Sequence, residues 1–207
     1  MIIHYIIVVL IGYLLGCLNL AFFIGKAKGF DIRKYGSNNA GASNATITMG
    51  TKIGIMVGIH DIFKSYLAVL IASCLFPQLS GIKAIAGASA VLGHIFPFYL
   101  KFKGGKGFAP FLGMILALDW KFFIFIVIVV FIVTFISDYI VVGTFTTIIL
   151  FPIYMCFLEQ NLITILPILI ASLTILLKHF VNIQKILKGE EIGFRRALNK
   201  KDKVNNN

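Results

Sequence analysis

Long apolar runs constrain this chain more than any other feature of its sequence. Runs of roughly 20 residues alternate with short polar segments between Ile2 and Leu177. A helix needs about 20 consecutive apolar residues to cross a bilayer. Hydrophobic residues make up 59% of the 207 positions, and the mean hydropathy is +0.96. This share exceeds that of a typical soluble domain, so the sequence predicts an all-α integral membrane protein.

Seven segments are candidates for transmembrane helices. They cover residues 2–25, 53–76, 82–100, 107–118, 122–137, 139–158 and 162–178. The fourth and fifth are short, so a tilted or partly re-entrant pair is the alternative, with six or five crossings as fallbacks. The first segment lacks a basic n-region and a small-residue cleavage site, so we expect a retained helix rather than a signal peptide. The expected organisation is one membrane domain, residues 1–188, and a polar basic tail, residues 189–207.

Positive charge lies on one side of this arrangement. Sixteen of the 19 Lys and Arg residues share a side when loops 26–52 and 101–106 and the tail from Lys178 are assigned to it. The other side holds Lys83 and Lys121. Basic loops stay in the cytoplasm, which predicts an outside N-terminus, a cytoplasmic C-terminus and an odd number of crossings. Because the basic residues lie between apolar runs, the net charge of +11 does not indicate a nucleic-acid partner.

The sequence offers few groups for metal or nucleophilic chemistry. Cys17, Cys74 and Cys156 lie inside apolar runs, without metal-ligand or redox spacing. Neither paired carboxylates nor a Ser/His/Asp order accompanies them. We therefore expect no metal and no cofactor.

Two polar loops stand out. Residues 35–46 are uncharged and rich in Gly, Ser and Asn, a composition that presents N–H groups to an anion where it opens a helix. Residues 101–107 place three lysines around a Gly-Gly pair, which is typical of a phosphate cradle but lacks Walker A spacing. An ordinary capped connection and a basic loop touching anionic headgroups are the respective alternatives.

Polar residues also occur within or beside apolar runs. His179 and Asn182 are three apart at the end of the last run, so they share a face if the helix continues. A histidine that snorkels to the interface is the alternative. Asp61 and Lys64 lie inside the second run, where an ion pair is costly and is by default a functional hypothesis. A purely structural pair remains equally open.

Three motifs in this order resemble those of the bacterial acyl-phosphate:glycerol-3-phosphate acyltransferases. Residues 36–44 resemble G-S-x-N-x-G-A-T-N, and residues 93–97 with 102–107 resemble G-H-x-[FY]-P followed by F-K-G-G-K-G. His179 to Ile183 with Gly189-Glu190 resembles H-x-x-N-I-x-R-L-x-x-G-x-E. The agreement covers nearly the whole chain.

The resemblance implies a seven-helix enzyme of the bacterial inner (plasma) membrane, with its active site facing the cytoplasm. Members of this family transfer a fatty acyl group from acyl phosphate to the sn-1 hydroxyl of glycerol 3-phosphate. The products are lysophosphatidic acid and phosphate, in the first acylation of phospholipid synthesis. Coenzyme A and acyl carrier protein are not direct donors, and no metal is needed. The implied partners are membrane lipids and the two substrates, without an obligate protein partner.

The resemblance also implies the site residues. By motif position, the candidate catalytic residues are Ser37, Lys106, His179 and Asn182. The candidate phosphate-binding residues are Ser37, Asn39, Gly41, Asn44, Lys103, Gly104, Gly105, Lys106, Gly107 and Thr144, and His94 and Glu190 support the motifs. The proton of the attacking hydroxyl would go either to His179 or to the substrate's own phosphate.

Several positions depart from the family pattern. Ile47 stands where the first signature continues to a phosphate-binding arginine, and Val141 stands where a serine is usual. Ala109-Pro110 replaces Ala-Thr, and Lys185-Ile186 replaces the R-L pair. A distant lysine reproduces an Arg–phosphate contact poorly. A paralogue with another substrate or lost activity is therefore one alternative, and a small transporter of phosphorylated substrates is another.

Overall fold

The computed structural model describes residues 1–159, 161–191, 193 and 195, which form helices and no strand. In chain order the elements are α1 (Ile2–Cys17), α2 (Leu20–Ala27), η1 (Ile32–Lys34), α3 (Ala42–Met49), α4 (Thr51–Leu75), α5 (Ile82–Ile95), η2 (Phe98–Leu100), α6 (Phe108–Leu118), α7 (Trp120–Ser137), α8 (Ile140–Leu158) and α9 (Leu162–Leu187). The predicted all-α class is confirmed. Most of the expected polar tail, residues 189–207, lies outside the described residues.

Six stretches of the described chain are long and apolar enough to cross a membrane. They are residues 2–27, α4, α5 with η2, α7, α8 and α9. The fourth predicted segment is helical, but α6 has 11 residues, fewer than one crossing requires. The last segment was predicted to end at residue 178, whereas α9 continues to Leu187. His179 and Asn182 therefore lie inside one continuous helix.

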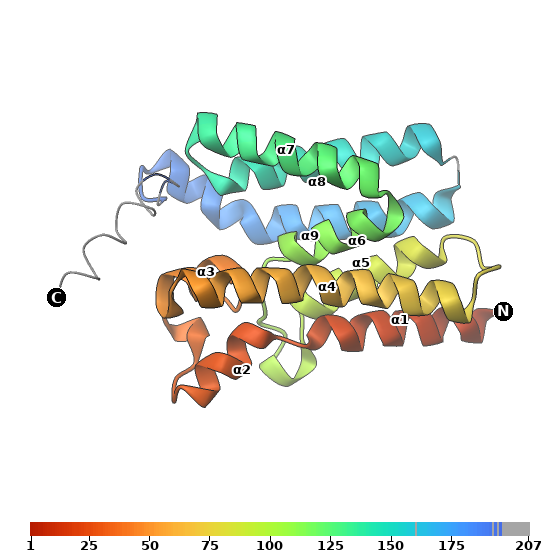
Figure 1. Ribbon diagram of the computed structural model, residues 1–207, viewed down its shortest axis with the longest axis horizontal. Helices are drawn as coiled ribbons and strands as arrows, with labels where there is room; N and C mark the ends of the chain where they lie inside the picture. The colour runs from red at the N-terminus through yellow and green to blue at the C-terminus, as the bar shows by residue number, and fades with distance from the viewer. Residues whose placement is uncertain (160, 192, 194, 196–207) are drawn as a thin grey trace.

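The long helices run side by side along the longest axis of the molecule (Figure 1). Helices α2 and α3 lie at one end, together with the last turns of α9 and the start of α8, while the N-terminus lies at the opposite end. Helices α5 and α6 have 14 and 11 residues, whereas α4 and α9 have 25 and 26. Because of this difference, the segment that joins α5 to α6 is set back from the end where α3 lies.

Most of the apolar core lies between α5, α6, α7, α8 and α9, with Phe111 and Phe151 in edge-to-face contact at its centre. A second cluster joins α1, α4 and α5 around Val8 and Val69. Most exposed side chains of α7 and α9 are also large and apolar, among them Phe131, Ile136 and Leu177. Such a surface is suited to lipid rather than to water.

Small residues allow α1 and α5 to pack closely. A side chain at Gly12 or Gly16 would overlap the backbone of Ala86 or Ala90, and one at Gly93 would overlap the carbonyl of Tyr13. Close approach of this kind is typical of helix pairs in membranes.

The first predicted segment is interrupted. Helix α1 ends at Cys17 and α2 begins at Leu20, because the side chain of Asn19 caps α2 by accepting from the N–H of Phe22 at 2.9 Å. The break releases the carbonyls of Cys17 and Leu18 from helical hydrogen bonding.

Candidate active site

Of the polar segment at residues 35–46, only residues 35–41 precede α3, and they are called the first loop below. The side chain of Asn44 holds this loop by hydrogen bonds from the inside. Its side chain is fully buried in the first turn of α3. Its Nδ2 donates to the carbonyls of Ile32, Tyr35 and Asn39 at 2.7–3.0 Å, and its Oδ1 accepts from the N–H of Ser37 at 2.7 Å. Asn44 was expected to bind phosphate, but both ends of its amide are engaged within the protein. In this structure it is a scaffold for Ser37.

Asn39 orients the hydroxyl of Ser37. Its Nδ2 donates to Ser37 Oγ at 2.9 Å and to the Ser37 carbonyl at 3.1 Å, and its Oδ1 accepts from the N–H of Gly41 at 3.0 Å. Because Ser37 Oγ already accepts, its hydrogen can donate to a ligand. Gly41 is the N-cap of α3, so the first loop ends at a helix N-terminus.

The lysine loop, residues 101–107, is held by hydrogen bonds that use the backbone of its two central glycines. The N–H of Gly104 donates to the Ile95 carbonyl, and that of Gly105 donates to the His94 carbonyl, each at 3.1 Å. A Cβ at Gly105 would overlap the imidazole of His94. The two glycines therefore serve close packing against the end of α5, and their N–H groups are not presented to an anion.

The start of α6 supplies donors instead. Gly107, at φ +92°, is the N-cap of this helix, and Lys106 directly precedes it. N–H groups in the first turn of a helix have no partner within the helix, and the helix dipole favours negative charge there. The backbone of Lys106 thus leads directly into a helix end that attracts anions.

Hydrogen bonds join the lysine loop to the first loop and to the Arg33 side chain of η1. The N–H of Ala40 donates to the Gly104 carbonyl at 3.2 Å. Arg33 donates to the carbonyls of Leu100 and Lys103, at 2.7 and 3.3 Å, and its guanidinium is paired with Asp31. The hydrogen bonds from Arg33 lower the pKa of Asp31, and Asp31 in turn raises the pKa of Arg33. The first loop and the lysine loop are therefore one connected unit.

Lys106 and Asn182 meet directly. Lys106 Nζ donates to Asn182 Oδ1 at 2.5 Å, and Asn182 Nδ2 donates to Glu191 Oε1 at 2.6 Å. Burial lowers the pKa of Lys106 below its ordinary value of 10.5, while the Glu191 carboxylate acts in the opposite direction. These two hydrogen bonds join the lysine loop to the last turns of α9.

Glu191 is a site residue that the sequence interpretation missed. Glu190 was assigned to the third motif, but it is exposed, and it is the carboxylate of Glu191 that reaches Asn182. The signal was present in the sequence. The pattern G-x-E has one residue between its two named positions, so counting from Gly189 leads to Glu191.

His179 lies one turn before Asn182 on α9, buried and in edge-to-face contact with Phe145 of α8. Its Nδ1 lies 2.9 Å from the carbonyl of Ile175. A carbonyl only accepts, so Nδ1 carries the hydrogen, and in the neutral ring Nε2 keeps a lone pair. This tautomer makes Nε2 a proton acceptor.

The remaining candidates vary in their surroundings. Thr144 is buried on α8 next to Phe145, with its hydroxyl 3.4 Å from the Ile140 carbonyl, whereas the side chain of Lys103 is exposed. Ile47 is 53% exposed and lies over Gly36, one residue from Ser37. Among the described residues, no group of three or more His, Cys, Asp and Glu side chains is arranged to hold a metal ion.

The fold and this site define a class of protein. The chain is a polytopic helical membrane protein in which the first loop and the end of α9 both contact the lysine loop, which leads into α6. The glycerol-3-phosphate acyltransferase family model matches residues 6–189, and the chain belongs to that family.

Relatives support this assignment over most of the chain. Proteins named glycerol-3-phosphate acyltransferase from Thermosipho melanesiensis and Prochlorococcus marinus (strain MIT 9215) are 38% and 39% identical, over 91% and 90% of this chain and 92% and 95% of their own lengths. The fold matches PlsY (YgiH), an integral membrane glycerol 3-phosphate acyltransferase, in its glycerol 3-phosphate form. That match has a TM-score of 0.85 and 30% identity, covering 92% of this chain and 95% of that one. The lysophosphatidic acid form of PlsY matches with a TM-score of 0.79.

Proposed function

We propose that this protein transfers a fatty acyl group from acyl phosphate to the sn-1 hydroxyl of glycerol 3-phosphate. The products are lysophosphatidic acid and phosphate, and the reaction is the first step of phospholipid synthesis. The observation that carries the proposal is the junction of Lys106 with Asn182. It lies beside His179 and the start of α6, in a chain of the glycerol-3-phosphate acyltransferase family.

In this reaction the hydroxyl oxygen of glycerol 3-phosphate forms a bond to the acyl carbonyl carbon. The bond from that carbon to the phosphate oxygen breaks, and phosphate leaves with the bonding electrons. Acyl phosphate is an activated mixed anhydride with a good leaving group. The protein therefore contributes mainly by positioning the two substrates and compensating negative charge.

The side chains divide this work in the proposal. Lys106 and the first turn of α6 compensate the charge of a phosphate group, and the Ser37 hydroxyl donates to a substrate oxygen. The tautomer of His179 supports Nε2 as the acceptor of the hydroxyl proton. Asn182 holds the Lys106 ammonium by accepting from it.

The same proposal includes the position of the protein in the cell. Basic residues at the site end favour a cytoplasmic active site, an outside N-terminus and a bacterial inner membrane. A lipidic product that stays in the bilayer is consistent with a membrane scaffold. The protein needs membrane lipid and its two substrates but no obligate protein partner.

One observation favours a second candidate. Ile47 lies over Gly36, so an arginine there would reach the first loop, and the isoleucine provides no charge. A relative on the same fold with a different acceptor would be consistent with that apolar side chain. Glycerol 3-phosphate binding would then be weak and would improve in Ile47→Arg.

The test uses the purified protein in lipid with palmitoyl phosphate and glycerol 3-phosphate. Mass spectrometry measures lysophosphatidic acid and a colorimetric assay measures phosphate. The proposal predicts both products, in equal amounts, from palmitoyl phosphate but not from palmitoyl-coenzyme A. Turnover only in Ile47→Arg would favour the second candidate, and no turnover in either form would refute both.

A further inference from the structure

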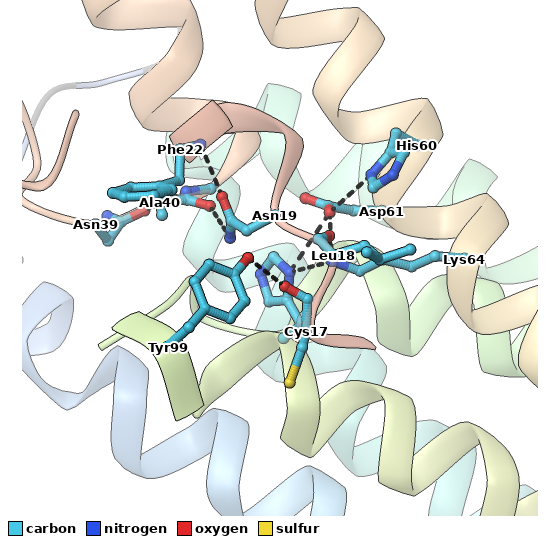
Figure 2. A network of polar contacts seen from close by, with 12 residues as sticks. Cys17, Leu18, Asn19, Phe22, Asn39, Ala40, His60, Asp61, Lys64 and Tyr99 are labelled. Atoms are coloured by element: carbon cyan, nitrogen blue, oxygen red, sulfur yellow. Dashed lines mark hydrogen bonds and ion pairs between the residues drawn. The ribbon is translucent and has the colours of Figure 1, made fainter. Parts of the chain in front are cut away.

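A buried polar network lies beneath the lysine loop, outside the residues assigned to the reaction. Figure 2 shows its centre, where Asp61 and Lys64 of α4 meet the break between α1 and α2. Lys64 Nζ lies 2.8 Å from Asp61 Oδ1, and His60 Nδ1 lies 3.5 Å from the same oxygen. Asp61 and Lys64 are 1% and 2% exposed, so both charges are withdrawn from water and lipid.

Lys64 has three polar partners. Its Nζ donates to the Leu18 carbonyl at 2.8 Å and to His94 Nδ1 at 2.9 Å, and it forms an ion pair with the Asp61 carboxylate. An ammonium group has three donors and no acceptor. Two acceptors and one paired carboxylate surround this group, and together they offset the cost of burying its charge. One of these partners, the Leu18 carbonyl, is available because α1 ends at Cys17.

The contact with Lys64 determines the tautomer of His94. Lys64 can only donate, so Nδ1 of His94 must present its lone pair, and the hydrogen of the neutral ring lies on Nε2. His94 Nδ1 is 3.5 Å from Asp61 Oδ1, farther than from Lys64. Lys64 therefore fixes both the rotation and the protonation pattern of this ring.

The fixed ring supports the lysine loop. His94 packs so closely on Gly105 that a Cβ there would overlap the imidazole, and the His94 carbonyl accepts from the N–H of Gly105 at 3.1 Å. Lys106 is the next residue, and its ammonium reaches Asn182 on α9. A continuous set of contacts thus runs from the ion pair in α4 to the proposed catalytic lysine.

The same break in α1 and α2 reaches the first loop (Figure 2). The Cys17 carbonyl accepts from the Tyr99 hydroxyl at 2.6 Å, and Asn19 Nδ2 donates to the Ala40 carbonyl at 3.0 Å. The N–H of Ala40 donates to Gly104. The network therefore contacts both loops of the site.

We propose that Lys64 and Asp61 are positioning residues for the acyl transfer: they fix His94, and His94 fixes Gly105 and hence Lys106. The inference rests on the proposed function. Energetics argue against a role in stability alone, because replacing a buried ion pair with uncharged residues of similar volume is often neutral or stabilising. A pair retained only for stability would be replaceable without loss of turnover.

The decisive variant is the double substitution Asp61→Asn with Lys64→Met, which removes both charges while keeping similar volumes. Lys83→Met is the matched control, since Lys83 is exposed at the other end of α5. We expect the double variant to unfold at the wild-type Tm or above it, and its kcat to fall about a hundredfold, as for a displacement of about 1 Å. KM for both substrates should change far less, and Lys83→Met should match the wild type.

A second readout does not depend on turnover. Nitrogen-15 NMR of histidine-labelled protein, with the His94 signals assigned by their loss in His94→Gln, reports which ring nitrogen carries hydrogen. We expect Nε2–H in the wild type. In Lys64→Met we expect Nδ1–H to appear, because Asp61 then becomes the nearest partner of Nδ1.

Two results would overturn the inference. One is a folded double variant with wild-type kcat, and the other is a wild-type His94 with its hydrogen on Nδ1. If the wild type fails to acylate glycerol 3-phosphate, the proposed function fails by itself. The NMR result then still decides whether Lys64 sets the His94 tautomer.

Discussion

Substituting Gly105 with alanine isolates the contact between the lysine loop and His94. The backbone of Gly105 has no left-handed φ, so an alanine is sterically acceptable to the chain itself. Its Cβ would, however, overlap His94 Nε2 and lie 2.7 Å from Cε1 and 2.9 Å from Cδ2. Carbon atoms in ordinary contact are about 3.5–4.0 Å apart, so relief requires a shift of more than about 1 Å.

The imidazole has little freedom to make that shift, because Lys64 holds its Nδ1 at 2.9 Å. The loop must move instead and carry Lys106 with it. Overpacking of this kind costs about 1–3 kcal/mol of stability, and a displacement of about 1 Å costs about a hundredfold in rate. We therefore expect kcat/KM of Gly105→Ala to fall about a hundredfold, with a measurable loss in Tm.

Gly58→Ala is the matched control. A Cβ at Gly58 would meet the Ala42 methyl group at 3.6 Å, an ordinary contact, in the interior of α4. Alanine in a helix is favoured over glycine by about 1 kcal/mol, so this variant should keep wild-type turnover and an equal or higher Tm. Phosphate release from palmitoyl phosphate measures turnover, and thermal unfolding in detergent measures Tm. A Gly105→Ala protein with wild-type kcat/KM would refute the argument that this glycine sets the loop.

Three further outcomes follow from the site. Asn44→Ala leaves three carbonyls without their shared donor and should destabilise the protein by about 3 kcal/mol, seen as a lower Tm; an unchanged Tm would show that water replaces the amide. Glu191→Gln weakens a charge-assisted hydrogen bond to Asn182 and should lower kcat about tenfold, whereas Glu190→Gln should not, and equal effects would contradict the placement of Glu191. Burial lowers the pKa of Lys106, so the ammonium is fully charged at low pH and loses its charge as pH rises. We therefore expect kcat/KM to fall with rising pH along an alkaline limb that begins below pH 10.5. In Lys106→Arg this limb should move to higher pH. A limb unchanged in Lys106→Arg would assign it to another group.

Apolar run length predicted five of the six membrane-spanning stretches to within about two residues at each end, but it also predicted a crossing at residues 107–118, where α6 has 11 residues. Two further errors concern where a helix breaks and where one ends. The first run hides the break at Leu18-Asn19, and the last run hides nine further residues of α9. A break in the middle of an apolar run is stabilised by distant partners, here Lys64, Tyr99 and Ala40. Hydropathy does not report such partners.

The candidate site was predicted in part. Motif order named both loops and the end of α9, and in the structure Lys106 of the second loop contacts Asn182 of α9. The roles within the loops were less accessible. Asn44, Gly104 and Gly105 belong to motifs that suggest phosphate binding, yet their polar groups bond within the protein.

The ion pair of Asp61 and Lys64 was recognised from its spacing, but its purpose could not be predicted from it. A spacing of three residues on one helix indicates that the two side chains meet. The spacing does not indicate that a histidine 30 residues later in the chain also contacts the lysine. Tertiary contact alone connects that pair to the loop that carries Lys106.

The central claim is that the junction of Lys106, Asn182 and His179 performs the acyl transfer. Lys106→Met compared with Lys101→Met tests it most directly, since both lysines lie in the lysine loop and the side chain of Lys101 is exposed. The measurement is the amount of lysophosphatidic acid formed from palmitoyl phosphate and glycerol 3-phosphate in a single turnover. We expect Lys101→Met to form one equivalent at the wild-type rate and Lys106→Met to be slower by about a thousandfold, as when a main electrostatic donor is removed. Equal rates in the two variants would contradict the account.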